Sequence, residues 1–133
     1  MIFLNTDGGA RGNPGPSAIA YVIKDDSGLV LTSGGEYIGQ ATNNFAEYKA
    51  LILGLTEALK SGYKALTCRL DSELVVKQLN GEYSVKDLHL KDLYNHIQLL
   101  TKDFDFVSFH HVPRKENSEA DKLVNQVLDE RHR

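Results

Sequence analysis

The sequence predicts a single α/β domain whose elements follow the order βββαβααβα. The first 40 residues alternate apolar segments with glycine- and aspartate-rich turns, and later segments carry apolar residues at helical spacing. A length of 133 residues suits one domain, spanning 1–133, with a core of its own. Short turns make the first three strands antiparallel, whereas a crossover helix returns the fourth strand parallel to the first.

The N-terminal part contains the predicted antiparallel strands. An apolar run makes residues 2–7 the first strand. Glycine and proline make residues 8–16 a turn, and a second strand follows at about 17–24. The hairpin turn Asp-Asp-Ser-Gly at 25–28 leads to a third strand at about 29–37.

Helices dominate the rest of the chain. The first begins near Thr42, Asn43 and Asn44, which supply N-cap side chains, and Gly62 ends it. The same kinds of start and stop signals predict helices at about 42–62, 72–80, 86–102 and from 118, strands at about 65–70 and 105–111, and a polar loop at 113–117.

The composition is that of an ordinary globular protein, with 41% hydrophobic and 25% charged residues. No apolar run reaches membrane-spanning length and no signal-peptide pattern opens the chain, so we expect a cytoplasmic monomer with no membrane partner. The lone Cys68 lies in a predicted inner strand and is interpreted as a small buried hydrophobe.

Four acidic residues lie where a carboxylate is costly. Asp7 and Asp71 each end an apolar run, so both fall at the carboxyl ends of predicted inner strands, where open α/β sheets place ligands. Glu47 and Asp121 lie on the apolar faces of the first and last helices. Such charges are rare unless paired or bound to a cation, and no Lys or Arg is placed to neutralise all four. Clustered oxygen ligands suit Mg²⁺ or Mn²⁺.

The net charge of −3 neither supports nor excludes a polyanionic substrate. Setting the four clustered carboxylates aside leaves 14 of the 18 acidic residues against 15 Lys and Arg. Two bound divalent ions would further add positive charge where a phosphate would lie.

Five short motifs occur in order along nearly the whole chain: Thr6-Asp7-Gly8-Gly9, Gly12-Asn13-Pro14-Gly15-Pro16, Thr42-Asn43-Asn44-Phe45-Ala46-Glu47, Asp71-Ser72 and Glu119-Ala120-Asp121. In this order and spacing the chain resembles ribonuclease HI. The resemblance implies a mixed five-stranded sheet of order 3-2-1-4-5, with strand 2 antiparallel, flanked by helices. It also implies Mg²⁺-dependent endonucleolytic hydrolysis of the RNA strand of RNA·DNA hybrids, leaving 5′-phosphate and 3′-hydroxyl ends.

The resemblance implies catalysis with two metal ions, Mg²⁺ or Mn²⁺ as its substitute. Asp7 is expected to bridge the two ions because it is central in the sheet. Glu47 and Asp71 would complete the ligands of one ion, and Asp121 those of the other. Such ions activate a water, neutralise charge on the phosphoryl group and support the leaving 3′ oxygen. The alternative interpretation is that these residues are helix caps and strand-end turn formers.

The loop before the last helix carries Arg114 and Lys115. Many members of the family present a histidine here, whereas His110 and His111 of this chain lie earlier, so it resembles the branch with arginine in this loop. Because an arginine is no general base near neutral pH, we expect Arg114 to be a catalytic residue that contacts the scissile phosphate. The alternative is a solvated turn residue.

Further residues match family positions that contact the hybrid. Amide and hydroxyl side chains suit the 2′-hydroxyl and base edges in the minor groove, and an arginine suits a backbone phosphate. The alternative role of the polar residues is turn and cap formation, and both roles can hold together. The expected substrate-binding residues are Arg11, Asn13, Thr42, Asn43 and Asn44.

The chain also departs from parts of the family pattern. Residues 80–87 leave no room for the basic helical protrusion with which some members grip the hybrid, and Phe45 and Glu73 stand where a basic or amide residue often occurs. Two other functions stay open: a DNA junction resolvase with the same fold, and a catalytically inactive nucleic-acid-binding module. The Asn-rich helix start favours the ribonuclease, and the full set of carboxylates argues against the inactive module.

Overall fold

The computed structural model describes residues 1–131. Its elements follow the order that the sequence predicts, with one short 3₁₀ helix in addition. The strands are β1 (Phe3–Ala10), β2 (Gly15–Lys24), β3 (Val30–Ala41), β4 (Ala65–Leu70) and β5 (Phe106–His111); the helices are α1 (Asn43–Lys60), α2 (Glu73–Leu79), α3 (Leu88–Thr101), α4 (Ser118–Arg131) and the 3₁₀ helix η1 (Arg114–Asn117).

The five strands form one mixed sheet in the order β3-β2-β1-β4-β5, which confirms the predicted topology. β1 pairs antiparallel with β2, and β2 pairs antiparallel with β3. β4 pairs parallel with both β1 and β5. β1 is therefore the central strand, and the carboxyl ends of β1 and β4 lie on the same edge of the sheet.

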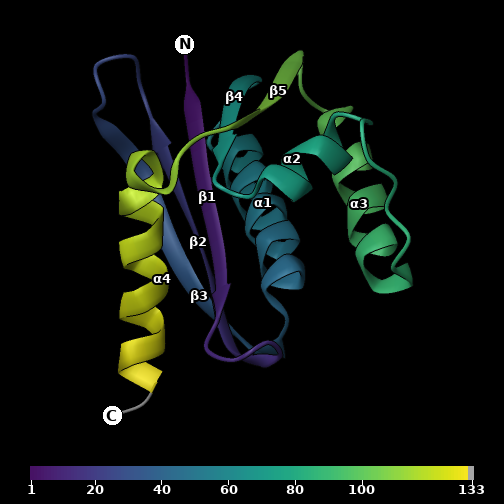
Figure 1. Ribbon diagram of the computed structural model, residues 1–133. Helices are drawn as coiled ribbons and strands as arrows, with labels where there is room; N and C mark the ends of the chain where they lie inside the picture. The colour runs from purple at the N-terminus through teal and green to yellow at the C-terminus, as the bar shows by residue number, and fades with distance from the viewer. Residues whose placement is uncertain (132–133) are drawn as a thin grey trace.

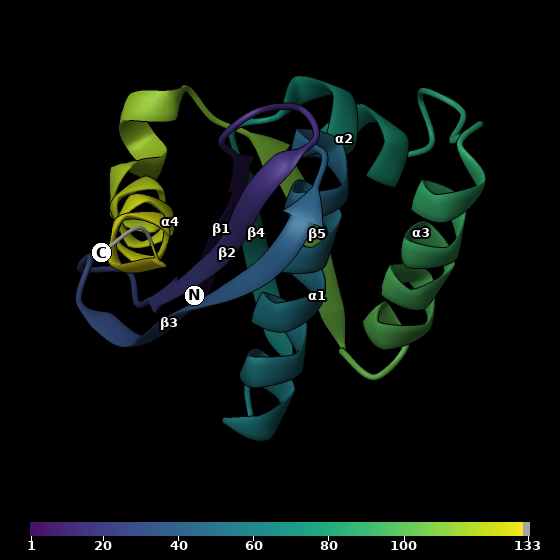
Figure 2. The same cartoon turned by 90° about the horizontal axis from the view of Figure 1, so that it is seen from below.

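Helices cover both faces of the sheet (Figure 1). α4 packs on one face, against β1, β2 and β3, and α1 packs on the other face, against β1 and β2. The view from below shows α3 packed outside α1 rather than on the sheet (Figure 2). Within residues 1–131, every helix falls short of the length or the apolar content that a membrane span requires.

The main core lies between the sheet and α1, where Leu4, Leu51 and Leu55 are fully buried. Small residues let this helix approach the central strand closely. A Cβ added to Gly54 would lie 2.8 Å from Leu4 Cδ1, and one added to Gly8 would lie 2.3 Å from the Ala46 backbone. The start of α1 is therefore held against β1 at the level of the acidic residues.

Several boundaries differ from the sequence prediction. β1 does not end at Asp7 but continues to Ala10, because the register with β2 runs on to the pair Ala10–Ser17. Pairing across this hairpin overrides the weak β propensity of glycine, and the predicted turn at 8–16 shrinks accordingly. β3 likewise extends to Ala41. The predicted loop at 113–117 contains η1, which runs directly into α4.

Candidate active site

Asp7 lies in the middle of the central strand, not at its end. It pairs with Ala20 of β2, and its side chain emerges beyond the last recorded backbone pair between β1 and β4, Asn5–Arg69. Only 7% of the residue is exposed. A carboxylate in this position has little water around it and depends on neighbouring groups for stabilisation.

Glu47 reaches Asp7 from α1. Its Oε1 accepts a hydrogen bond from the backbone N–H of Gly8 at 2.8 Å, which ties the helix to β1. This bond requires the close approach that the missing side chain of Gly8 permits. The other oxygen, Oε2, is buried and has no hydrogen-bond partner among residues 1–131.

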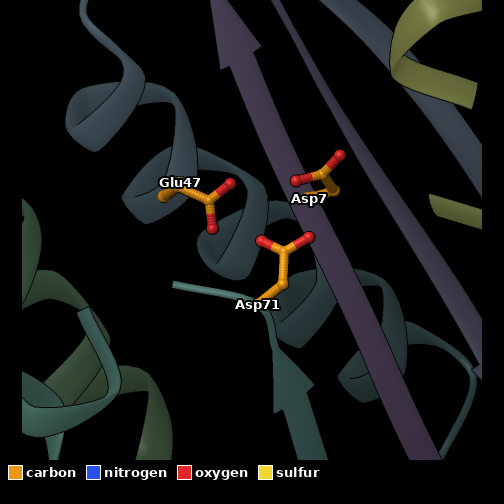
Figure 3. A group of neighbouring side chains, drawn as sticks. All are labelled: Asp7, Glu47 and Asp71. Atoms are coloured by element: carbon orange, nitrogen blue, oxygen red, sulfur yellow. The ribbon is translucent and has the colours of Figure 1, made fainter. Parts of the chain in front are cut away.

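Asp71 follows directly after β4 and completes a cluster of three carboxylates. One oxygen each of Asp7, Glu47 and Asp71 lies within 4.8 Å of the other two. Figure 3 shows the three side chains converging from β1, α1 and the end of β4. Asp71 is half-buried, and its Oδ2 lies 3.4 Å from the Asn117 side-chain amide.

Asp121 lines the same cleft from the start of α4 but does not belong to this three-carboxylate cluster. Its Oδ1 lies 3.3 Å from Nη2 of Arg114, which projects from η1 with 78% of its side chain exposed. The structure thus brings all four predicted carboxylates and Arg114 to one cleft of about 400 Å³. Asp121 differs from the other three because it has a basic partner.

Burial and mutual repulsion make the cluster hold protons when no cation is bound. Burial raises the pKa of Asp7 to about 7, and the nearby charges of Asp71 and Asp121 add to this rise. Burial, followed by the charge of Asp7, raises the pKa of Glu47. Burial also raises the pKa of Asp71, although the Asn117 hydrogen bond and the Arg114 charge oppose it. Three carboxylates packed this closely need positive charge between them.

The cluster fits a divalent cation. Glu47 contributes a buried oxygen without a partner. Within residues 1–131, no ion pair joins a Lys or Arg to Asp7, Glu47 or Asp71. Three carboxylates provide the hard oxygen ligands that Mg²⁺ and Mn²⁺ prefer. A cation here would satisfy an oxygen and neutralise charges that the protein leaves uncompensated.

The predicted substrate-binding residues line two adjoining hollows. Arg11, Asn43 and Asn44 line the cleft that holds the carboxylates. Asn13 and Thr42 do not reach that cleft and instead line a second hollow of about 600 Å³, between the start of α1 and the start of α3. Because Asn43 and Asn44 border both hollows, the two form one continuous surface.

Several of these side chains already have structural partners. Asn13 Oδ1 accepts from the Asn43 N–H at 2.9 Å, Asn43 Oδ1 accepts from the Ala10 N–H at 2.9 Å, and Thr42 caps α1. Both amides therefore use their oxygen internally and retain an NH₂ group for a ligand. Arg11 is also engaged, with Nη2 lying 2.6 Å from Oδ1 of Asp129 on α4.

Sequence reasoning missed two buried amides, Asn5 and Asn117, each about 1% exposed. Asn117 donates to the Thr6 carbonyl at 2.8 Å and approaches Asp71, while Asn5 Nδ2 donates to Asn117 Oδ1 at 3.1 Å. One local signal was present. A polar Asn5 lies two residues from Asp7, on the same face of an otherwise apolar central strand.

The chain is similar to several known proteins. The family model described as reverse transcriptase-like matches residues 5–127. Ribonuclease HI of Halobacterium salinarum is 44% identical over 124 residues, which are 93% of this chain and 62% of the relative. A bifunctional protein of Mycobacterium tuberculosis is 41% identical over 129 residues, 96% of this chain and 35% of the relative. The chain therefore spans between 35% and 62% of the length of these curated relatives.

Solved structures show the same relationship. The crystal structure of RNase H1 from Halobacterium salinarum has a TM-score of 0.94 and 42% identity, covering 97% of this chain and 98% of that one. LC11-RNase H1, isolated from compost and solved in complex with an RNA/DNA hybrid, has a TM-score of 0.96 and 41% identity, with 100% of both chains covered.

The sheet order, the helices on both faces and the acidic cleft define a ribonuclease H-like α/β protein. The comparisons identify it further: the chain belongs to the ribonuclease H family. The resemblance to ribonuclease HI that the five motifs carry is confirmed.

Proposed function

We propose that this protein is an endoribonuclease that hydrolyses the RNA strand of RNA·DNA hybrids with two divalent ions, leaving 5′-phosphate and 3′-hydroxyl ends. One observation carries the proposal: three carboxylates converge within 4.8 Å, and a buried Glu47 oxygen has no partner in the described chain. A relative of the same fold has been solved with an RNA/DNA hybrid, which supports the choice of substrate.

Asp7, Glu47 and Asp71 would hold one ion, and Asp7 with Asp121 would hold the other. When bound, divalent ions in such sites activate a water and neutralise the charge that develops on the phosphoryl group. The residues of this chain bring one oxygen each of Asp7, Glu47 and Asp71 within 4.8 Å of the other two, and Asp7 and Glu47 are buried. Mg²⁺ is the expected ion and Mn²⁺ its substitute, because both accept carboxylate oxygens.

Arg114 is the candidate for direct contact with the scissile phosphate. Its side chain is exposed and lines the cleft, and within residues 1–131 its ion-pair partner is Asp121. A guanidinium donates two parallel hydrogen bonds to a phosphate, which positions the group and offsets its charge. Binding of the substrate would therefore exchange the Asp121 contact for a phosphate contact.

The polar surface beside the cleft accounts for the proposed preference for RNA. Asn13 and Asn43 use their oxygens within the protein, so each presents an NH₂ donor. Asn44 lines both hollows, and its side chain makes no hydrogen bond in the described part of the chain. Donors and a free amide suit 2′-hydroxyl oxygens, the group by which RNA differs from DNA. Thr42 and Arg11 would contact the backbone at either end of this surface.

A cleavage assay tests the function directly. Labelled RNA·DNA hybrid, duplex RNA, duplex DNA and a four-way DNA junction are incubated with Mg²⁺, Mn²⁺, Ca²⁺ or EDTA, and the ends are mapped. We expect cleavage of the hybrid with Mg²⁺ or Mn²⁺ only, because the longer bonds and higher coordination number of Ca²⁺ do not suit the geometry of attack. If the protein cut the junction but not the hybrid, it would be a resolvase. If it bound nucleic acid without cutting any substrate, it would be a non-catalytic binding module.

A further inference from the structure

One side-chain amide links β1, which carries Asp7, to Asp71, which directly follows β4. The backbone register between β1 and β4 runs from Phe3–Thr67 to Asn5–Arg69, so it ends two residues before each carboxylate. Beyond this point Asn117 Nδ2 donates to the Thr6 carbonyl at 2.8 Å and lies 3.4 Å from Asp71 Oδ2. A residue of η1 thus bridges the strands where their own hydrogen bonds stop.

The orientation of this amide is fixed at both ends. Asn117 Oδ1 accepts a hydrogen bond from Asn5 Nδ2 at 3.1 Å, and Asn5 also donates to the Glu116 carbonyl at 3.3 Å. Both amides are 1% exposed. Because its oxygen is engaged by Asn5, Asn117 must present its NH₂ group to Thr6 and Asp71. Ionisation of Asp71 strengthens the contact, since a carboxylate is a stronger acceptor than a neutral group.

We propose that Asn117 is a positioning residue that orients the Asp71 carboxylate for joint cation binding with Asp7 and Glu47. The inference rests on the proposed function, because it concerns the same site. Asp71 is the most exposed of the three carboxylates and lies in the segment between β4 and α2. Among residues 1–131, Asn117 is the hydrogen-bond partner of its side chain. Groups that hold a metal-ligating carboxylate control both affinity and activity.

A purely structural role is the competing explanation. Asn117 also anchors η1 and the start of α4 to β1, so its loss would destabilise the fold whatever Asp71 does. Asn5 offers a matched control, because it is equally buried and belongs to the same network. Asn5→Ala removes the hydrogen bonds to Asn117 and Glu116 but no contact with a carboxylate, and the 2.8 Å bond from Asn117 to the Thr6 carbonyl still keeps the Asn117 NH₂ group on the side of Asp71.

The first test compares Asn117→Ala with Asn5→Ala in hybrid cleavage at saturating Mg²⁺, with the Tm of each variant measured alongside. We expect kcat to fall about 10- to 100-fold for Asn117→Ala, with KM nearly unchanged, and only about 3-fold or less for Asn5→Ala. Equal losses of kcat that follow the losses in Tm would overturn the positioning role.

Asn117→Asp covers the case in which the alanine variant does not fold. It preserves the size of the side chain and the acceptor for Asn5, but it removes the donor that faces both the Thr6 carbonyl and Asp71 and places a like charge beside Asp71. A Tm near that of the wild type with the same loss of kcat would support the proposal. Wild-type kcat in a folded Asn117→Asp would contradict it.

The second test is calorimetric titration with Mn²⁺ alone, which separates this inference from the proposed function. We expect Asn117→Ala to bind Mn²⁺ about 10-fold more weakly than the wild type, and Asn5→Ala to bind it nearly as well. If the wild type binds Mn²⁺ but cleaves no hybrid, the proposed function fails while this difference still supports positioning. The same Mn²⁺ affinity in both variants would overturn the positioning role.

Discussion

Nη2 of Arg114 lies 3.3 Å from Oδ1 of Asp121, and both residues line the acidic cleft. The arginine side chain is 78% exposed and the aspartate side chain 27%, so water and salt screen the pair. A contact of this kind is easily exchanged for a stronger partner. It places a positive charge beside Asp121, and under the proposed function the guanidinium would move from Asp121 to a phosphate.

Replacing Arg114 tests this exchange. Arg114→Ala should lower kcat on the hybrid by roughly 10- to 100-fold, the size expected for one charge-assisted phosphate contact of about 1.5–3 kcal/mol. Steady-state cleavage measures the change. Arg114→Lys should restore only part of the rate, because a point charge does not reproduce a two-pronged contact. Lys115→Ala, an exposed neighbour with the same charge change, is the control. If kcat of Arg114→Ala were no lower than that of Lys115→Ala, Arg114 would be a solvated turn residue without a role in catalysis.

Asp7→Asn should abolish cleavage while hybrid binding stays largely intact, because an amide preserves the shape but loses the charge that holds a cation. Loss of a metal's stabilisation of the transition state costs several kcal/mol, so we expect less than about 10% residual activity. Asp105→Asn is the control, since this exposed aspartate precedes β5 at the opposite edge of the sheet. If Asp7→Asn retained more activity than this, Asp7 would not be the bridging ligand.

The carboxylates could be predicted because each violates a local pattern. Asp7 and Asp71 each end an apolar run, and Glu47 and Asp121 lie on apolar helix faces, so the apolar patterns of strands and helices make them stand out. The patterns also predicted the order of the elements along the chain, whereas the order of the strands in the sheet was implied by the family resemblance.

The supporting contacts could not be predicted in the same way. Asn5 and Asn117 are 112 residues apart in sequence, and no periodicity relates them. Asn13 and Asn43 are 30 residues apart, so the sequence did not predict the hydrogen bond between them either. The extension of β1 to Ala10 depends on pairing with β2 rather than on the propensity of its glycines. Tertiary contacts decided each of these features.

The stability of the metal-free protein should fall as the pH rises from about 4 to 8. The pKa of Asp7 is about 7 in the folded state, and that of Glu47 is raised, whereas unfolded acids titrate near 4. Between these values the native state binds more protons than the unfolded state, so the free energy of unfolding declines with pH. The decline is complete once the pH exceeds the folded-state values. Thermal unfolding in EDTA across this range measures it.

Asp7→Asn should remove most of this pH dependence and raise the Tm in EDTA at pH 8 by a few degrees, equivalent to about 1 kcal/mol. Asp121→Asn is the comparison: it also relieves repulsion on Asp7 but loses the screened ion pair with Arg114, so its rise in Tm should be smaller. In millimolar Mg²⁺ the advantage of Asp7→Asn should shrink, because ions that bind only the native wild type stabilise it. An unchanged or lower Tm for Asp7→Asn in EDTA would mean that repulsion within the cluster is already relieved.

Gly8→Ala should weaken both the fold and the cation site. The added Cβ would lie 2.3 Å from the carbonyl carbon and oxygen of Ala46, so α1 must move away from β1. Overpacking of this kind costs about 1–3 kcal/mol, and the displacement also stretches the 2.8 Å bond from the Gly8 N–H to Glu47. We therefore expect a lower Tm together with weaker Mn²⁺ binding in calorimetry. Gly9→Ala is the matched control, because within residues 1–131 its Cβ would meet a single side-chain atom, a Val124 methyl group at 3.3 Å, and a side chain can adjust where a backbone cannot. If Gly8→Ala bound Mn²⁺ as tightly as Gly9→Ala, the position of Glu47 would not depend on the contact between α1 and β1.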